Sequence, residues 1–209
     1  MTFEELDELM GGGLVEADWH QHPNGKGWVQ NTAHVDVRAL VTPDAIVYQS
    51  ATVLGDVRIY GTARVFGWAN VRQLAEVYGN ARISGYADVS GSAHVYGNAN
   101  VAVCAKVFGD ASVSGDTSIY GNAQIFGRSS VSGDAVVLGG AWIFGGAQVY
   151  GGAVISGDAW VCGQADISGD ARVFDFARVC GTSRLFGGAW VYLNATADSV
   201  VLFGDSRLF

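Results

Sequence analysis

Few side chains in this sequence have the types and spacing that catalysis requires. Of the four histidines, His20 and His22 lie in the N-terminal segment, whereas His34 and His94 are expected to face outward on strands. His94 follows Glu76 by three periods of a six-residue repeat that runs through the chain. The two become neighbours if three repeats close one coil, and a histidine beside a carboxylate is the arrangement of a general base. His94 is therefore the one candidate catalytic residue, and we favour the alternative of an ordinary surface histidine.

The cysteines show no pattern typical of a metal site or a redox motif. Cys104, Cys162 and Cys180 form no CxxC pair and have no histidine at ligand spacing. Cys162 and Cys180 are also three repeats apart, which permits a disulfide in a chain that coils with that period. We expect reduced thiols instead, because the acidic segment from Met1 to Met10 is unlike a secretory signal and a cytoplasmic location is predicted.

Amide and carboxylate side chains recur in one column at the same spacing, namely Asn80, Asn98, Asp116 and Asp134. Oxygen ligands stacked about 5 Å apart could hold a cation. Asp and Asn are also the residues that turns favour. We favour the second interpretation, and we predict neither a metal nor a cofactor.

Large apolar side chains recur at positions expected to face solvent. Trp142 and Trp160 are three repeats apart, as are Val136 and Val154, so two adjacent faces of the same two coils carry them. Contiguous exposed apolar surface usually marks an interface, and Trp is enriched at interface hot spots. These four residues are the predicted interface. The alternative is a packing face beneath the C-terminal tail.

Two further columns consist of aromatic residues: Tyr60, Tyr78 and Tyr96 in one, Phe108, Phe126 and Phe144 in the other. Stacked rings could bind a sugar or another planar ligand. We favour the interpretation that they are contacts between neighbouring coils, since such stacking is a common structural device.

The six-residue repeat produces all of these spacings. From Ala33 to Asn194 the chain divides into 27 consecutive hexads without an insertion or deletion. Ala occupies the first position of 23 hexads, Val or Ile the third position of all but one, and Gly the fifth position of 20. An unbroken period of this length predicts a solenoid.

The repeat also predicts the shape of each coil. The first and third positions lie on one side of a strand, because side chains alternate with period two. Ala and Val therefore point inward together, while the Gly and the Asp or Asn that follow form a turn. Each hexad is one strand and one corner, and three hexads close a triangular coil. The 27 hexads thus give about nine coils of a parallel β-helix.

Each hexad pairs an aliphatic residue with a small residue four positions later, as in Val77-Tyr78-Gly79-Asn80-Ala81, and the segment Gly25-Lys26-Gly27-Trp28-Val29 precedes the first hexad. In both features the chain resembles the hexapeptide-repeat superfamily, in particular bacterial and prophage proteins described as hexapeptide acyltransferases. The resemblance implies left-handed coiling, an exception to the right-handed crossover rule. It also implies acyl transfer from acetyl-CoA, with a histidine on an interrupting loop or at a subunit boundary. No loop interrupts residues 33–194, which counts against catalysis.

The N-terminal segment, residues 1–32, is predicted to be a cap. Thr2 is placed to cap a helix from Phe3 to Met10, and the run of glycines from Gly11 ends it. We expect this segment to plug the first coil, as capping units do in solenoids.

Residues 33–194 are the predicted left-handed β-helix, and residues 195–209 are predicted to form an irregular final coil. The register slips there, because Ala195–Ser199 is a unit of five residues. An open parallel edge invites pairing with another chain. Phe203 and Phe209 are therefore predicted interface residues at an association end.

The charge and hydropathy of the chain limit its partners. The net charge of −8 makes nucleic acid an unexpected partner, since nucleic-acid binders present a basic stripe. No apolar run approaches the length that a membrane-spanning helix needs, so no such segment is predicted.

The leading functional hypothesis is a non-catalytic structural or binding protein. Its rigid β-helix would mediate homo-oligomerisation, through the Trp/Val face or the C-terminal end, or binding to a protein partner. The first alternative is a hexapeptide acyltransferase that uses acetyl-CoA with His94 as its base. The second alternative is an acidic, phage-type inhibitor or decoy of a nucleic-acid enzyme.

Overall fold

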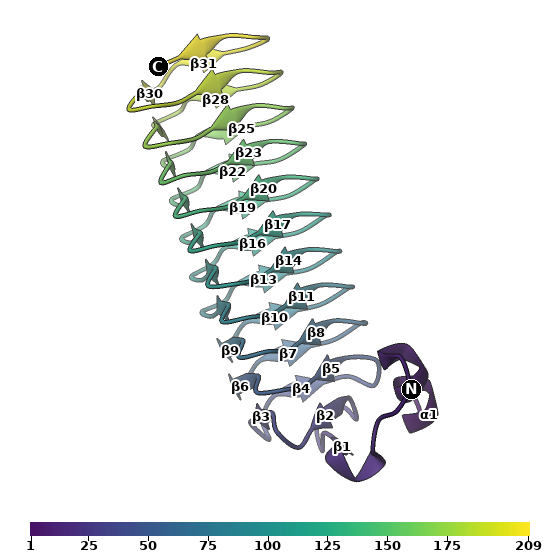
Figure 1. The fold of residues 1–209 in the computed structure, drawn as a ribbon. Helices are drawn as coiled ribbons and strands as arrows, with labels where there is room; N and C mark the ends of the chain where they lie inside the picture. The colour runs from purple at the N-terminus through teal and green to yellow at the C-terminus, as the bar shows by residue number, and fades with distance from the viewer.

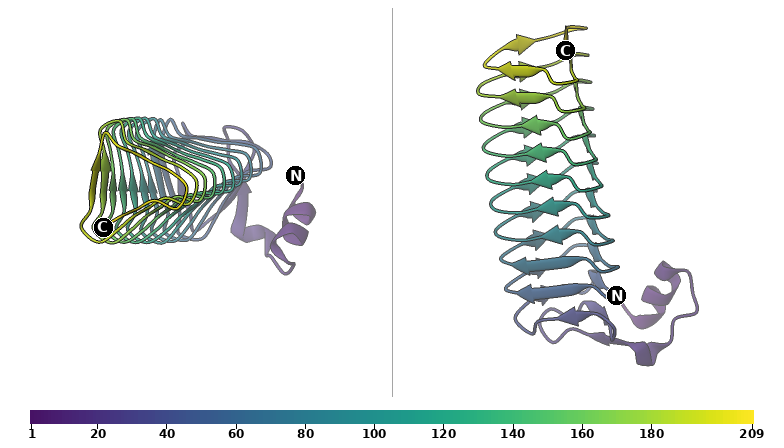
Figure 2. Two further views of the ribbon diagram at one scale, coloured as in Figure 1. Left: turned by 90° about the horizontal axis from the view of Figure 1, so that it is seen from above. Right: turned by 60° about the vertical axis from the view of Figure 1, so that its left-hand side comes forward.

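The computed structural model describes residues 1–209 and shows a long prism of stacked coils, with the N-terminal segment beside its base (Figure 1). Each coil contributes one strand to each of three sheets that run the length of the prism (Figure 2). The predicted all-β solenoid with coils of three hexads is confirmed. It has ten coils rather than about nine, because two of the three sheets contain ten strands each and the third is longer.

Sheet 1 is the longest, and its first pair of strands is antiparallel while all its other pairs are parallel. In spatial order it contains β1 (Trp19–Gln21), β2 (Trp28–Gln30), β5 (Ile46–Val47), β8 (Arg64–Val65), β11 (Arg82–Ile83), β14 (Asn100–Val101), β17 (Ser118–Ile119), β20 (Val136–Val137), β23 (Val154–Ile155), β26 (Arg172–Val173), β29 (Trp190–Val191) and β32 (Arg207–Leu208).

Sheet 2 is parallel throughout. It contains β3 (His34–Val35), β6 (Thr52–Gly55), β9 (Asn70–Gln73), β12 (Asp88–Val89), β15 (Lys106–Val107), β18 (Gln124–Ile125), β21 (Trp142–Ile143), β24 (Trp160–Val161), β27 (Arg178–Cys180) and β30 (Thr196–Asp198).

Sheet 3 is also parallel. It contains β4 (Leu40–Val41), β7 (Arg58–Ile59), β10 (Glu76–Val77), β13 (His94–Val95), β16 (Ser112–Val113), β19 (Ser130–Val131), β22 (Gln148–Val149), β25 (Asp166–Ile167), β28 (Arg184–Leu185) and β31 (Val201–Leu202).

The interior of the prism is built from the first and third positions of the hexads, as predicted. The Ala and Val or Ile side chains at these positions form one continuous buried core from the first coil to the last. Two serines that replace Ala stay satisfied by bonding to the backbone: the Ser129 hydroxyl donates to the Phe126 carbonyl at 2.9 Å, and the Ser183 hydroxyl to the Ala197 carbonyl at 3.1 Å. A small side chain is needed there because three strands converge on a slender interior.

The fifth position adopts a left-handed backbone conformation in every hexad except the first two, where Val37 and Pro43 stand, which explains why Gly fills most of these positions. The same conformation occurs where another residue stands at this position, at Gln49, Gln73, Val103, Asp175 and Leu193. The corner geometry is therefore set by the stacking of coils and not by the residue. The amide oxygens of Gln49 and Gln73 accept from the N–H of the glycine one coil above, at 2.8 and 2.6 Å.

The predicted N-terminal helix is confirmed as α1 (Phe3–Met10), and Thr2 forms a capping box with Glu5. A short 3-10 helix, η1 (Glu16–Asp18), leads from it to β1. The structure contains no helix with the length and apolar character needed to cross a membrane.

The helix lies beside the prism (Figure 2), so it is not the part of the N-terminal segment that closes the first coil. Leu6 is fully buried in a small cluster with Trp19, Trp28 and Ile46. Ile46 occupies an outward position of the first coil, so α1 covers the outer surface of sheet 1. The physical reason is that Ile46 and Trp28 offer an apolar patch on that surface, whereas the first coil is closed by other residues.

The closing residues belong to the Gly25–Val29 segment. The Gly27 N–H donates to the Val41 carbonyl at 2.8 Å, and Val29 joins the core of the prism. A Cβ on Gly25 or Gly27 would overlap the backbone of Val41 or Thr42. Glycine is required at both positions because the backbone approaches this closely.

The last residues of the chain continue all three sheets. Arg178 pairs with Thr196, which lies three hexads later in the sequence. Arg184 pairs with Val201, which comes one position earlier than three hexads would place it. The five-residue unit seen in the sequence is therefore absorbed at the corner between β30 and β31. Ser199 at this corner takes a positive φ.

Candidate functional site

The most prominent side-chain cluster lies on the outer surface of sheet 2. Trp142 and Trp160 pair in register on β21 and β24, and their rings are parallel with centroids 5.3 Å apart. Phe126 meets Trp142 edge-on at 6.1 Å, and Phe144 meets Trp160 in the same way at 6.2 Å. Phe108 extends the phenylalanine stack below them, 4.8 Å from Phe126. We call these five residues the aromatic face.

The hexad explains why the two columns meet. The second and fourth positions of a hexad lie on the same side of a strand, so Trp142 and Phe144 point outward together. The three-hexad period of the coil then places Trp160 and Phe126 against them. The five rings are half-buried by one another and remain partly exposed to solvent.

Positive charges stand at both ends of the aromatic face. The Arg178 guanidinium lies over the Trp160 ring, 4.6 Å from its centroid, which is a cation–π contact. Lys106 on β15 is exposed and forms no ion pair. The face therefore combines apolar rings with a positive rim.

In the two coils above Phe144, the position of the phenylalanines is occupied by Cys162 and Cys180, which form a disulfide. The expected reduced thiols are not what the structure has. The two residues occupy the same position of consecutive coils, and their Cα atoms are 4.6 Å apart, within the range that a disulfide spans. Cys104 is free and half-buried at another corner.

Val136 and Val154 do not share a surface with the tryptophans. They lie on β20 and β23 of sheet 1, and the corner formed by residues 138–141 separates them from sheet 2. Both valines are half-buried. The four predicted interface residues therefore form two surfaces, one with the valines and one with the tryptophans. A flat partner surface can contact only one of the two pairs.

Phe203 and Phe209 lie on the last coil and are the most exposed of the predicted interface residues, at 61% and 76%. Phe203 stacks on Phe186 at 5.8 Å, and Phe209 lies tilted against Tyr192 at 5.7 Å. They follow β31 and β32, so they belong to different sheets from the aromatic face.

The candidate catalytic residue His94 contacts Glu76, as the spacing predicted. The His94 Nδ1 atom is 3.6 Å from Glu76 Oε2. Glu76 also accepts a hydrogen bond from the Tyr60 hydroxyl at 3.0 Å and lies 3.4 Å from the Arg58 guanidinium. Burial, followed by this hydrogen bond, raises the pKa of Tyr60 to about 12.

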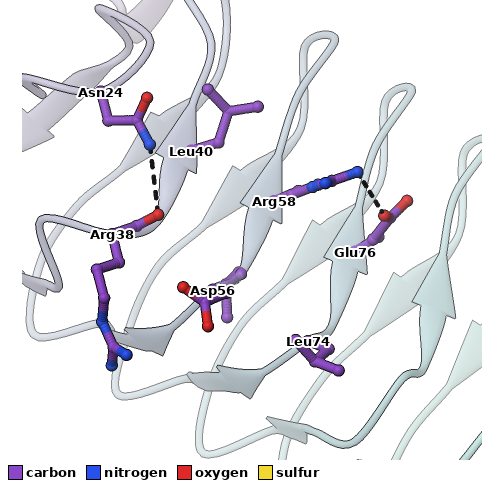
Figure 3. A pocket seen from close by; sticks show the side chains of 8 residues that line it. Asn24, Arg38, Leu40, Asp56, Arg58, Leu74 and Glu76 are labelled. Atoms are coloured by element: carbon purple, nitrogen blue, oxygen red, sulfur yellow. Dashed lines mark hydrogen bonds and ion pairs between the residues drawn. The ribbon is translucent and has the colours of Figure 1, made fainter.

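A surface hollow of about 470 Å³ adjoins this group on sheet 3, and Figure 3 shows its lining. Arg58 and Glu76 face each other across neighbouring strands on one side, and Asn24 donates to the Arg38 carbonyl on the other. Leu40 and Leu74 contribute apolar surface. His94 is not among the lining residues.

The other three histidines, His20, His22 and His34, belong to the N-terminal part of the chain. His20 Nδ1 is 2.8 Å from the amide oxygen of Asn31, and His22 is buried in the turn that it forms with Asn24. The structure contains no cluster of three His, Cys, Asp or Glu residues that could hold a metal ion.

The column predicted as turn residues forms a chain of side-chain hydrogen bonds. Asn80 donates to Asn98 at 2.9 Å, and Asn98 donates to Asp116 at 2.6 Å. These bonds occupy the amide oxygen of Asn98 and one carboxylate oxygen of Asp116.

The sequence interpretation missed that Phe126, Phe144 and Arg178 belong to the tryptophan cluster, since it treated the phenylalanine column separately. The signal was present in the sequence. The second and fourth positions of a hexad share a side of the strand, and Arg178 follows Trp160 by one coil.

Comparison with known proteins supports the fold. A family model described as "YdcK Beta solenoid repeat" matches residues 147–163, which include Val154 and Trp160. The chain is thus similar to a β-solenoid repeat over a segment of about one coil. No curated protein matches the chain.

Proposed function

We propose that this protein is a non-catalytic binding protein, a rigid solenoid that presents the aromatic face to a second copy of itself or to another macromolecule. The observation that carries the proposal is the cluster of Trp142 and Trp160 with Phe126 and Phe144, in which parallel and edge-on contacts fix every ring. Large apolar side chains clustered on a surface are typical of interfaces, and Trp is the residue most enriched at their energetic centres.

The rigidity of the cluster favours binding. Association costs free energy when it immobilises mobile side chains, on the order of 1 kcal/mol for each flexible one. The rings of the aromatic face are already held by their neighbours in the coils above and below, so a partner orders little more.

The stacking also indicates what kind of contact is available. The faces of the parallel rings cover one another, which leaves their edges toward solvent. Ring edges suit edge-to-face contacts with apolar and aromatic side chains of another protein. A sugar would instead need a free ring face, so a protein partner fits better.

Light scattering after gel filtration tests the proposal with the double variant Trp142→Ser/Trp160→Ser. Serine is tolerated at outward positions of this solenoid, as at Ser112 and Ser130, so the variant should fold. If the wild type is an oligomer and the variant a monomer, the aromatic face binds a second copy. If the wild type is monomeric, the wild type and the variant are each used to capture binding partners from cells. A partner that binds the wild type and is lost with the variant then binds at the aromatic face.

The matched control is Trp68→Ser/Tyr86→Ser. These two rings also stack, at 5.2 Å, and they are exposed at 57% and 61% on a different corner. An equal loss of association in the control and in the Trp142/Trp160 variant would overturn the assignment to the aromatic face.

Two more variants separate the other predicted surfaces. Val136→Ser/Val154→Ser removes the apolar pair on sheet 1, and Phe203→Ser/Phe209→Ser removes the pair on the last coil. Because these pairs lie on different surfaces from the tryptophans, we expect neither to change association through the aromatic face.

Acyl transfer from acetyl-CoA, the activity implied by resemblance to the hexapeptide-repeat superfamily, is the second candidate. The contact between His94 and Glu76 favours it, since a carboxylate orients and stabilises a histidine base. The test is thiol release from acetyl-CoA with a panel of amine and hydroxyl acceptors. Activity that His94→Ala abolishes, while the fold is kept, would establish the enzyme and overturn the binding proposal.

The hypothesis of an acidic decoy gains no support from the surface. Carboxylates on the prism lie beside arginines in four ion pairs: Asp36–Arg38, Glu76–Arg58, Asp88–Arg72 and Asp166–Arg184. These four pairs interrupt the acidic surface that a mimic of nucleic acid would present, while the other carboxylates of the prism form no ion pair with an arginine.

A further inference from the structure

Two arginines lie side by side on the outer surface of sheet 1 without a counter-charge. Arg64 on β8 and Arg82 on β11 pair in register, directly above one another. They line a surface hollow of about 400 Å³ whose other lining residues are Thr62, Asn80, Asn98 and Asn100. Every lining residue is polar, and none is a carboxylate.

The pair differs from most arginines of the prism. Arg58, Arg72 and Arg184 are each paired with a carboxylate on a neighbouring strand. Three others, namely Arg172, Arg178 and Arg207, lie over tryptophan rings. Arg64 and Arg82 have neither kind of partner. Like charges directly opposite on adjacent strands are destabilising, so the pair has a cost that a bound anion would remove.

The amides around the two arginines present donors to the hollow. Asn80 donates to Asn98, and Asn98 donates to Asp116, so the Asn98 oxygen accepts a bond from within the protein. Asn100 donates to the Tyr120 hydroxyl at 2.9 Å. The Thr62 hydroxyl also bonds to the Asn80 oxygen. Each amide nitrogen carries a second N–H that none of these bonds uses. Asp116 is the carboxylate at the end of the chain, and it does not line the hollow.

We infer that this hollow is a binding site for a phosphate group, free or as a small phosphate monoester. A guanidinium presents a planar fork of N–H donors that matches two phosphate oxygens. Two forks one coil apart, about 4.8 Å by strand spacing, approach a single dianion from neighbouring positions. The amide N–H groups of the asparagines complete a set of donors with no competing acceptor charge.

The inference is independent of the proposed function, because the site lies on sheet 1 and the aromatic face on sheet 2. The net charge of −8 opposes an anion at long range, but the Debye length is about 8 Å at physiological salt. Local charge therefore decides whether the anion binds. Binding should weaken as sodium chloride is added.

Titration calorimetry and thermal unfolding with inorganic phosphate test the site, at an ionic strength held constant with sodium chloride. We expect phosphate to raise the melting temperature of the wild type. The variant Arg64→Gln/Arg82→Gln should bind at least tenfold more weakly and lose that rise. The matched control is Arg128→Gln, which removes another exposed arginine that forms no ion pair and should leave phosphate binding unchanged.

A second arm replaces inorganic phosphate with glycerol phosphate, and tighter binding of the ester would identify a phosphorylated metabolite as the ligand. The melting temperature without phosphate checks the fold: the double variant should be at least as stable as the wild type, since the like charges are gone. Failure of the wild type to respond would overturn the inference. Equal responses of wild type and double variant would also do so, because phosphate excluded from the surface stabilises any fold.

Discussion

Two aromatic columns of this prism have the same geometry and different surroundings. The tyrosine column, Tyr60, Tyr78 and Tyr96, stacks with centroid distances of 4.6 and 4.7 Å. The phenylalanine column, Phe108, Phe126 and Phe144, stacks at 4.8 and 5.0 Å. Both spacings follow from the distance between coils, so stacking itself indicates nothing about function.

The neighbouring column makes the difference. Beside the tyrosines stand Arg58, Glu76 and His94. Glu76 pairs with Arg58, contacts His94 and accepts a hydrogen bond from the Tyr60 hydroxyl. Beside the phenylalanines stand Trp142 and Trp160, which add edge-on contacts. In a solenoid, the outward residues at the second position decide what a surface can bind, while the ladder at the fourth position supports the coils.

The largest expected effect concerns the disulfide between Cys162 and Cys180, which extends the phenylalanine column. The tyrosine column is extended by two serines instead, Ser114 and Ser132. The variant Cys162→Ser/Cys180→Ser frees a loop of about one coil. By loop-closure entropy it should lower the free energy of unfolding by about 3 kcal/mol. Urea unfolding measures the loss.

The control for that variant is Cys104→Ser, which removes the free thiol and should leave the urea midpoint unchanged. Alkylation of unfolded, unreduced protein should modify Cys104 alone. Modification of all three cysteines would show that the disulfide does not form, and in protein taken from cells it would agree with the cytoplasmic location predicted from the sequence.

The next effect compares the centres of the two columns. Phe126→Ala removes two stacked contacts and the edge-on contact with Trp142, and it should cost about 2 kcal/mol. Tyr78→Ala removes two stacked contacts alone and should cost about 1 kcal/mol. Denaturant midpoints of both variants check the order. Equal losses would mean that the tryptophans contribute nothing to the phenylalanine column.

The pH dependence of the two columns should also differ. The pKa of Tyr60 is raised from the ordinary value of 10.0 to about 12. A group whose pKa is higher in the folded state stabilises the fold below its unfolded pKa, and this contribution is lost as pH rises through the folded value. Stability should therefore fall between about pH 10 and about pH 12 more steeply in the wild type than in Tyr60→Phe.

Urea unfolding at several pH values measures that difference, with Phe126→Leu as the control from the column that does not titrate. The control should follow the slope of the wild type. If the stability of Tyr60→Phe falls with pH as steeply as that of the wild type, groups other than Tyr60 cause the loss of stability at alkaline pH.

The smallest effects concern the charged neighbours of the two columns. Arg178→Gln removes a cation–π contact with Trp160 at 4.6 Å and should cost about 1 kcal/mol. Arg58→Gln removes an exposed ion pair with Glu76 and should cost about 0.5 kcal/mol or less. Thermal unfolding of the two variants at low and high salt tests this, and the Arg58 effect should be the one that salt reduces.

Much of the candidate site followed from the three-hexad period of the coils. It predicted that His94 contacts Glu76 and that Trp142 lies against Trp160, because parallel strands in register place such residues side by side. It offered no basis for choosing between a disulfide and two thiols at Cys162 and Cys180. It also failed for α1, because Leu6 packs on Ile46 at a position that the repeat assigns to solvent.

The sequence by itself determined the architecture. Ala and Val alternate with turn residues in an unbroken six-residue period, and a chain with that pattern buries its small side chains by coiling into a parallel solenoid. It determined the helix from Phe3 to Met10 as well, since the capping box is a local signal. The first feature repeats one relation in every coil, so the period of the sequence is enough to predict it, and the second is local to the first turn of the helix.

Only the tertiary structure decided the rest. It set the phenylalanine rings edge-on against the tryptophans at 6.1 and 6.2 Å, and it joined Cys162 to Cys180 in a disulfide. It also stacked Arg64 and Arg82 in a hollow without a counter-charge. The physical reason is that these relations arise between coils and across corners, where the direction of each side chain and the position of each charge depend on the closed prism.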